Sequence, residues 1–137
     1  MTTFQIANGT VQVGDQSPIR GGMTTSDIEA AGFRLEREID MKTGWVFKMA
    51  RPVEVAGMSM GLAFGLEHDR LRRVDMVIQI ITDLETLLGL HNAFLLHALG
   101  NPTEIKSGGY RYVYEWGTIT SVTDPRARSS DIIISWR

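Results

Sequence analysis

The chain has 137 residues, of which 43% are hydrophobic and 22% are charged, and its formal net charge is −2 at pH 7. This composition is ordinary for one globular domain, and the acidic balance argues against a general nucleic-acid binder, which needs a basic surface. The chain has no cysteine, which excludes disulfides, thiol catalysis and thiolate metal sites.

The N-terminal stretch MTTFQIANGTVQVGDQ has neither the basic region nor the apolar core of a signal peptide. The most apolar runs, such as residues 74–81, are too short to span a bilayer. We therefore expect a cytoplasmic protein with a single domain over residues 1–137. We expect no membrane partner, no nucleic-acid partner and no cofactor.

The first predicted element is a hairpin over residues 4–6 and 11–13. It turns at Asn8-Gly9, a pair that tolerates positive φ at both central positions of a type I′ turn. Residues 15–22 form a loop. A short helix then starts at Thr24, whose side chain is expected to form a capping box with Asp27, and it ends near Ala31.

Residues 33–41 alternate between apolar and charged side chains, which predicts a strand with one wet face. The expected apolar face carries Phe33, Leu35, Ile39 and Met41, and the charged face carries Arg34, Glu36, Glu38 and Asp40. Arg37 breaks this pattern. The next strand starts at Trp45 and is expected to end at Pro52 or to lie at an edge.

Residues 58–66 predict a strand with large side chains on one face and only small ones on the other. The small face leaves room for a helix of this chain or for a partner. A strand over residues 71–81 follows. Arg70, Arg72 and Arg73 lie near carboxylates in the sequence, which favours surface ion pairs over a site for a phosphate or an acidic partner.

A second helix is predicted from a cap at Thr82 or Asp83 to a stop at Gly100, with Gly89 as a point where it divides. Strands are expected over residues 103–106, 110–116, 118–123 and 132–136. This order predicts an α+β fold, with a mostly antiparallel sheet and two helical segments on one face. Residues 22–82 and 83–137 are candidate helix-plus-meander repeats.

Gly57-Met58-Ser59-Met60-Gly61 fits the G-x-S-x-G motif of a nucleophile elbow, but Ser59 falls inside a predicted strand, where the motif's turn cannot form. His91 and His97 are six residues apart and so lie on different helix faces, unlike an i, i+4 metal pair. His91 is expected to be a hydrogen-bonded core residue. We predict no catalytic residue and no metal ligand.

The aromatic strand places Tyr110, Tyr112, Tyr114 and Trp116 on one face by its period of two. One interpretation is that this face is core beneath a helix. It is favoured because the opposite face carries Arg111 and Glu115, which are costly to bury unpaired. The other interpretation is an exposed interface, with Tyr110 the most exposed.

Two short patterns resemble a known group. Gly22-Met23-Thr24 followed by Asp27-Ile28 is similar to its helix start, and Leu99-Gly100-Asn101-Pro102 followed by Val113-Tyr114-Glu115-Trp116 is similar to its continuation. The group is the β-lactamase-inhibitor-protein-like fold, shared with SmpA/OmlA-type lipoproteins. The resemblance implies units of a helix and a four-stranded antiparallel sheet. The chain departs from the group in having no lipobox cysteine and no disulfides.

In size, acidity and predicted strand content the chain also resembles small bacterial toxin-immunity proteins. We therefore expect a non-enzymatic protein that binds another protein, such as a toxin or an effector enzyme, and blocks its active site. The expected contacts are Trp45, Tyr110, Tyr112, Tyr114, Trp116, Glu36, Glu38 and Asp40.

Two alternatives stay open. One is a small enzyme or ligand-binding domain with a pocket between helix and sheet, using His91, His68 or Asp69. The other is a structural module that self-associates through its small-residue strand, so that the chain is a monomer or a homodimer.

Overall fold

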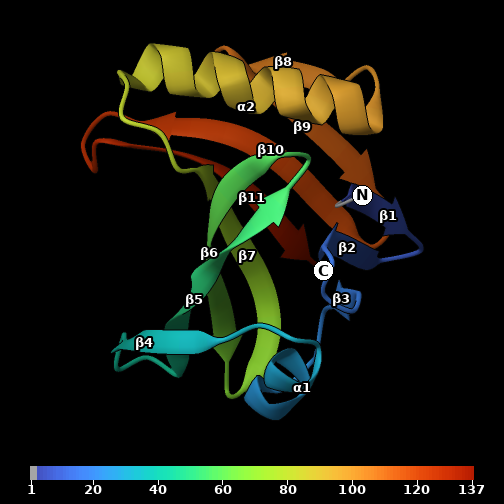
Figure 1. Cartoon of the computed structure of the whole chain (residues 1–137), viewed down its shortest axis with the longest axis vertical. Helices are drawn as coiled ribbons and strands as arrows, with labels where there is room; N and C mark the ends of the chain where they lie inside the picture. The colour runs from blue at the N-terminus through green and yellow to red at the C-terminus, as the bar shows by residue number, and fades with distance from the viewer. Residues whose placement is uncertain (1–2) are drawn as a thin grey trace.

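The structure is a computed structural model, and it describes residues 3–137 (Figure 1). The helices are α1 (Thr25–Ala30) and α2 (Leu84–Leu99). The strands are β1 (Thr3–Ala7), β2 (Thr10–Gly14), β3 (Ile19–Arg20), β4 (Leu35–Asp40), β5 (Trp45–Val55), β6 (Met58–Glu67), β7 (Arg70–Ile78), β8 (Glu104–Lys106), β9 (Gly109–Tyr114), β10 (Gly117–Asp124) and β11 (Ser129–Trp136). The predicted α+β class is confirmed.

An eight-stranded antiparallel sheet in the order β4-β5-β6-β7-β11-β10-β9-β8 is the main layer. Each half of this order is a meander that follows one helix, since α1 precedes β4 to β7 and α2 precedes β8 to β11. The last strands of the two meanders, β7 and β11, pair with each other, with Ile132 opposite Met76. In Figure 1, α2 lies across the second meander and α1 lies at the far end of the first.

The core lies on the face of the sheet that the helices cover. Strand β6 directs Met60, Leu62, Phe64 and Leu66 to this face, and all four are buried. The ring of Phe33, just after α1, meets Phe64 edge-on with centroids 5.0 Å apart. The large-residue face predicted for this strand is therefore core.

The N-terminal hairpin forms a separate sheet in the order β1-β2-β3. Asn8 and Gly9 have φ of 51° and 84°, which is the backbone that the Asn-Gly turn requires. Phe4 packs on Phe94 of α2 with ring centroids 5.3 Å apart. The hairpin thus closes one end of the core. The predicted loop over residues 15–22 contains the short strand β3.

Both helix starts follow their capping residues. Thr24 and Asp27 form the predicted capping box, and Asp83 is the cap of α2, accepting from the backbone N–H of Thr86 at 2.7 Å. Gly89 does not divide α2, which runs unbroken to Leu99. The cost of one helical glycine is about 1 kcal/mol, which packing of α2 on the sheet outweighs.

The single apolar face predicted for residues 33–41 is wrong. The register of β4 shifts between Leu35 and Arg37, so Leu35 pairs with Ala50 on the core face, while Ile39 pairs with Phe47 on the other face. A bulge inserts one residue and so exchanges the two faces beyond it. Arg37, the residue that broke the pattern, lies at this shift.

Further boundaries differ from prediction, and among them is the end of β7, which lies at Ile78 and not at residue 81. Strand β5 continues past Pro52 to Val55, because a second register irregularity between Ala50 and Val53 accommodates the missing proline N–H. Trp116 lies in the turn between β9 and β10, where Tyr114 pairs directly with Gly117. It is therefore not the fourth residue of an alternating strand.

Candidate protein-binding face

One face of the eight-stranded sheet is covered by neither helix, and we call it the open face. Directly paired residues of antiparallel strands share a face, so the register traces this face across the sheet. Ile39 pairs with Phe47, Phe47 with Gly65, Gly65 with Arg73, and Arg73 with Ser135. The buried side chains of the same strands point to the opposite, helix-covered face.

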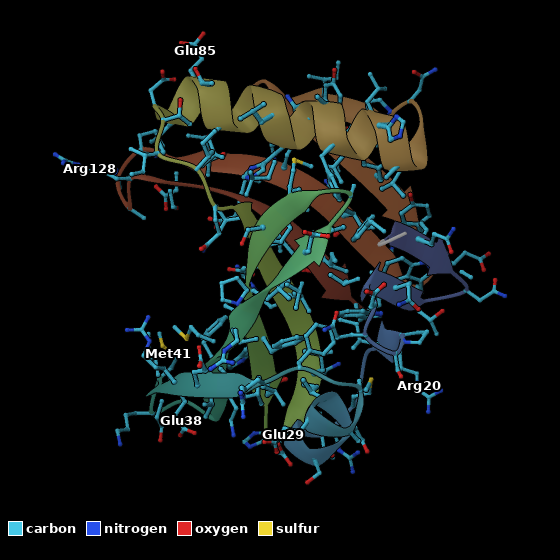
Figure 2. All side chains as sticks on the ribbon, in the orientation of Figure 1. Arg20, Glu29, Glu38, Met41, Glu85 and Arg128 are labelled. Carbon is cyan, nitrogen blue, oxygen red and sulfur yellow. The ribbon has the colours of Figure 1, made fainter. Side chains whose placement is uncertain are left out.

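An apolar strip lies on the open face along β4 and β5. It consists of Ile39, Met41, Trp45, Phe47 and Met49. The rings of Trp45 and Phe47 stack with centroids 6.1 Å apart, while Ile39 and Met41 are 51% and 49% exposed. Figure 2 shows Met41 at the end of β4 that turns into β5, away from α2. The strip is a contiguous set of partly exposed large side chains, which is typical of an interaction surface.

A groove of about 400 Å³ lies beside the apolar strip. The small side chains of β6, Gly61 and Ala63, form its floor, and Met49 and Val77 rise on either side. The groove is open to solvent above Ala63, whereas the side chains of Gln79 and Val77 lie against Gly61. The small-residue face of β6, which was predicted to leave room for a helix or a partner, is thus partly uncovered.

Next to the groove, Arg73 and Asp75 form a two-point ion pair. Nε and Nη2 of Arg73 donate to the two carboxylate oxygens of Asp75 at 2.8 and 2.7 Å. The hydrogen bonds to Asp75 raise the pKa of Arg73. The guanidinium also lies 5.7 Å from the centre of the Phe47 ring. These contacts fix the arginine flat against the sheet above Gly65.

Asp131 of β11 also lines the groove, and it has no basic partner of its own. Burial is the main cause that raises the pKa of its carboxyl, and the negative charge of Asp75 adds to the effect. No salt bridge within residues 3–137 involves Asp131, although a hydrogen bond from Ser129 and the charge of Arg73 oppose the rise in its pKa. A cation that entered the groove would therefore stabilise this carboxylate.

The three acidic residues predicted as charged contacts each pair with a neighbouring cation. Glu36 lies 3.1 Å from Arg51, Glu38 lies 3.6 Å from Lys48, and Asp40 lies 3.7 Å from Lys42, measured between nitrogen and oxygen. Glu36 lines the groove, whereas Glu38 and Asp40 pair in register with residues of the helix-covered side. The strand is therefore closer to neutral than its sequence suggests.

The tyrosines of β9 lie beneath α2. Tyr112 is 3% exposed, and its hydroxyl donates to the carbonyl of Gly100 at 2.8 Å. Tyr110 and Tyr114 are half-buried against the same core. Burial raises the pKa values of Tyr112 and Tyr114. The core interpretation of this face is the one that the structure shows.

Trp116 belongs to another cluster. Its ring stacks on Tyr114 with centroids 5.3 Å apart and meets Trp136 at 5.9 Å. Trp136 in turn donates from Nε1 to the carbonyl of Gly9 at 2.7 Å. This cluster joins the end of the main sheet to the N-terminal hairpin.

The predicted contacts therefore fall into separate places. Trp45 and the acidic residues of β4 lie together at one end of the sheet, and the aromatic residues of β9 lie at the other, with β6, β7, β11 and β10 between. At about 4.8 Å a strand, this separates β5 from β9 by roughly 24 Å. The structure does not bring the eight residues into one surface.

His91 is a core residue, as predicted. It is fully buried, its Nε2 accepts from the backbone N–H of Ile78 at 3.1 Å, and its Nδ1 lies 3.4 Å from the hydroxyl of Ser130. His97 is exposed, and Ser59 lies inside β6. Among residues 3–137, no three His, Asp or Glu side chains are grouped so as to hold a metal ion.

Sequence reasoning missed most of the groove. Asp75 and Asp131 come from strands 56 positions apart, and only their neighbourhood in the sheet order, with Ile133 opposite Asp75, brings them together. The small-residue face of β6 was the one feature of the sequence that indicated the position of the groove floor. The apolar strip was visible as alternation from Trp45 to Met49 but was not assigned to the open face.

None of the helices described in residues 3–137 has the length and hydrophobicity needed to cross a membrane. Comparison of the sequence with family models and with curated proteins, and of the fold with solved structures, gives no match.

Proposed function

We propose that this chain is a protein-binding domain that docks on its partner through the open face. The apolar strip carries the proposal, because five large apolar side chains lie on an uncovered sheet face, two of them about half exposed, and their burial against a partner is favourable. A buried aromatic anchor of the Trp45 kind contributes about 2 kcal/mol or more to an interface.

The groove supports a partner with a basic side chain. Asp131 is half-buried without a cation, and Asp75 beside it adds negative charge. A lysine or arginine that lay over Gly61 and Ala63 could rest its aliphatic part on the groove floor and place its charge at Asp131. The proposed partner surface is therefore apolar with a protruding basic residue.

Within this proposal, the chain acts as an inhibitor, an immunity protein that covers the active site of a bacterial toxin. The resemblance to the β-lactamase-inhibitor-protein-like group supports this, together with the order of a helix and a four-strand meander that occurs twice. The inhibitory role rests on the resemblance, and the docking face rests on the apolar strip.

The test uses two lysine substitutions of the same kind. Ile39→Lys places a charge in the apolar strip, and Ile105→Lys places it on β8 at the opposite sheet edge, where the side chain is 66% exposed. Each variant is co-expressed with toxins encoded next to its gene, and survival is measured. We expect Ile39→Lys to lose protection and Ile105→Lys to keep it, with both variants folded by circular dichroism.

Equal protection by the two variants would overturn the docking face. If the wild-type chain relieves the toxicity of no neighbouring reading frame, the immunity role is wrong. Sedimentation of the wild-type chain at micromolar concentration separates the remaining alternative, since a dimer that Ile39→Lys dissociates would show that the open face binds a second copy.

A further inference from the structure

A second cleft, with the opposite charge, lies where the N-terminal sheet meets the ends of β7 and β11. Its volume is about 300 Å³, and no acidic side chain lines it. The lining residues are Gly9, Arg20, Gly21, Gly22, Leu71, Arg72, Trp116, Trp136 and Arg137. Three arginines thus converge on one cleft from three segments that are distant in the sequence.

Two of these guanidinium groups have no carboxylate side chain as an ion-pair partner in the described part of the chain. No salt bridge within residues 3–137 involves Arg20 or Arg137, although Arg137 donates to the carbonyl of Tyr114 at 3.4 Å. Arg72 lies 3.3 Å from Glu67, and this pair is exposed. Figure 2 shows Arg20 pointing outward from β3, so its guanidinium lies at the rim of the cleft.

Carboxylates near the cleft are already engaged. Asp27, on which Arg20 acts through space, accepts from the backbone N–H of Thr24 in the capping box. Asp69 accepts from the backbone N–H and the hydroxyl of Thr25. The hydrogen bonds of Thr24 and Thr25 lower the pKa values of these two carboxyls. The carboxylates of Asp27 and Asp69 therefore balance part of the positive charge of the nearby arginines, but they do not line the cleft.

The walls and floor of the cleft leave room for a ligand. Trp136 packs closely on Gly21, where an added Cβ would come within 2.8 Å of the indole side chain. At Gly22, whose φ is +86°, an added Cβ would meet nothing within 4 Å. The backbone therefore packs against Trp136 at Gly21 and faces open space at Gly22.

We infer that this cleft binds a phosphate group, held by Arg20, Arg72 and Arg137 against a wall formed by Trp116 and Trp136. Guanidinium groups bind phosphate oxygens through paired N–H donors. Several guanidinium groups together match the charge of a phosphate dianion better than that of a single carboxylate. Indole walls exclude water and so strengthen these contacts. The phosphate comes either from a free inorganic anion or from a small phosphate ester.

This site is independent of the proposed function, because it uses none of the residues of the open face. The ligand-binding test relies on tryptophan fluorescence in a Trp45→Phe background, so that both remaining tryptophans, Trp116 and Trp136, line the cleft. The protein is titrated with inorganic pyrophosphate, with adenosine monophosphate and with adenosine, at constant ionic strength.

We expect saturable fluorescence changes with pyrophosphate and the monophosphate and none with adenosine. Tighter binding of the ester identifies a small organic phosphate as the ligand, and tighter binding of pyrophosphate identifies an inorganic anion. The double variant Arg20→Gln, Arg72→Gln should weaken binding at least about tenfold. Arg126→Gln, Arg128→Gln, which removes two charges from the exposed loop after β10, should leave it unchanged.

Two results would overturn the inference. One is the absence of any saturable change in the Trp45→Phe protein up to about 10 mM ligand, far above a specific dissociation constant. The other is an equal loss of affinity in the two double variants, which would mean that net charge alone attracts the anion.

Discussion

The backbone N–H of Ile78, the last residue of β7, donates to Nε2 of His91 in α2 at 3.1 Å. This bond places the ring proton on Nδ1, which faces the hydroxyl of Ser130 in β11 at 3.4 Å. One neutral imidazole thus joins the helix to the two strands where the meanders meet. Protonation of the ring would remove the acceptor for Ile78 and place a charge in the core.

His91 should therefore make the protein sensitive to acid. Burial lowers the pKa of His91 from 6.5 to about 4. The unfolded chain binds this proton first, so stability is full above pH 6.5 and falls as the pH drops toward 4. At about 1.4 kcal/mol per pH unit, the loss over this range approaches roughly 3 kcal/mol. Urea unfolding between pH 7.5 and 4 measures it.

His91→Gln should lower stability at pH 7 but flatten its dependence on pH between 6.5 and 4. The matched control is His97→Gln, because His97 is exposed in the last turn of the same helix. The contributions of Asp69 and Asp83, whose pKa values are lowered from 3.8, are lost mainly below about pH 4, at the acid end of this range. An unchanged slope in His91→Gln would show that other groups carry the acid sensitivity.

The hydroxyl of Tyr112 should contribute to stability and not to binding. Tyr112→Phe removes its hydrogen bond to the carbonyl of Gly100 and should cost about 1 kcal/mol of unfolding free energy. Tyr110→Phe, in the same strand and half-buried, should change stability by less than about 0.5 kcal/mol, since its hydroxyl makes no hydrogen bond within residues 3–137. Chemical denaturation of both variants tests this, and equal effects would contradict it.

Gly65 should tolerate substitution less well than Gly61. An added Cβ at Gly65 would lie 2.7 Å from Cγ of Arg73 and 2.9 Å from the Phe47 ring, so Gly65→Ala should cost roughly 1–3 kcal/mol and disturb the apolar strip. At Gly61 the closest atom is Nε2 of Gln79, the end of a flexible side chain. Gly61→Ala should therefore cost less, as thermal unfolding of the pair will show. A larger loss at Gly61 would mean that the open face is packed differently.

The pKa of Asp131 should depend on the charged side chains that surround it in the groove. Its pKa is raised by burial and then by the charge of Asp75, and a hydrogen bond from Ser129 and the charge of Arg73 oppose this. Asp75→Asn should lower the pKa of Asp131, and Arg73→Gln should raise it further, both measured by carbon-detected NMR titration. Because the folded pKa is raised, this group favours folding more as the pH falls. If neither variant changed the pKa of Asp131, the charges of Asp75 and Arg73 would not act on this carboxyl.

The sequence predicted the elements well because their signals are local. Caps, turns and alternation gave both helices and the hairpin at Asn8-Gly9, all of which the structure contains. The bulge at β4 could not be predicted, because one inserted residue exchanges faces without changing composition. The groove could not be predicted either, since the pairing of β7 with β11 has no local signal.

Strand β4 is the longer of the two free edges of the main sheet, and its charges govern what can extend that edge. In a symmetric antiparallel pairing with a second copy, a residue faces itself across the axis. An axis at Glu38 opposes two glutamates, an axis at Arg37 opposes two arginines, and an axis at Ile39 sets Glu38 against Asp40. These three registers bring like charges together, which opposes pairing of this edge with a second copy and growth of the sheet into fibrils.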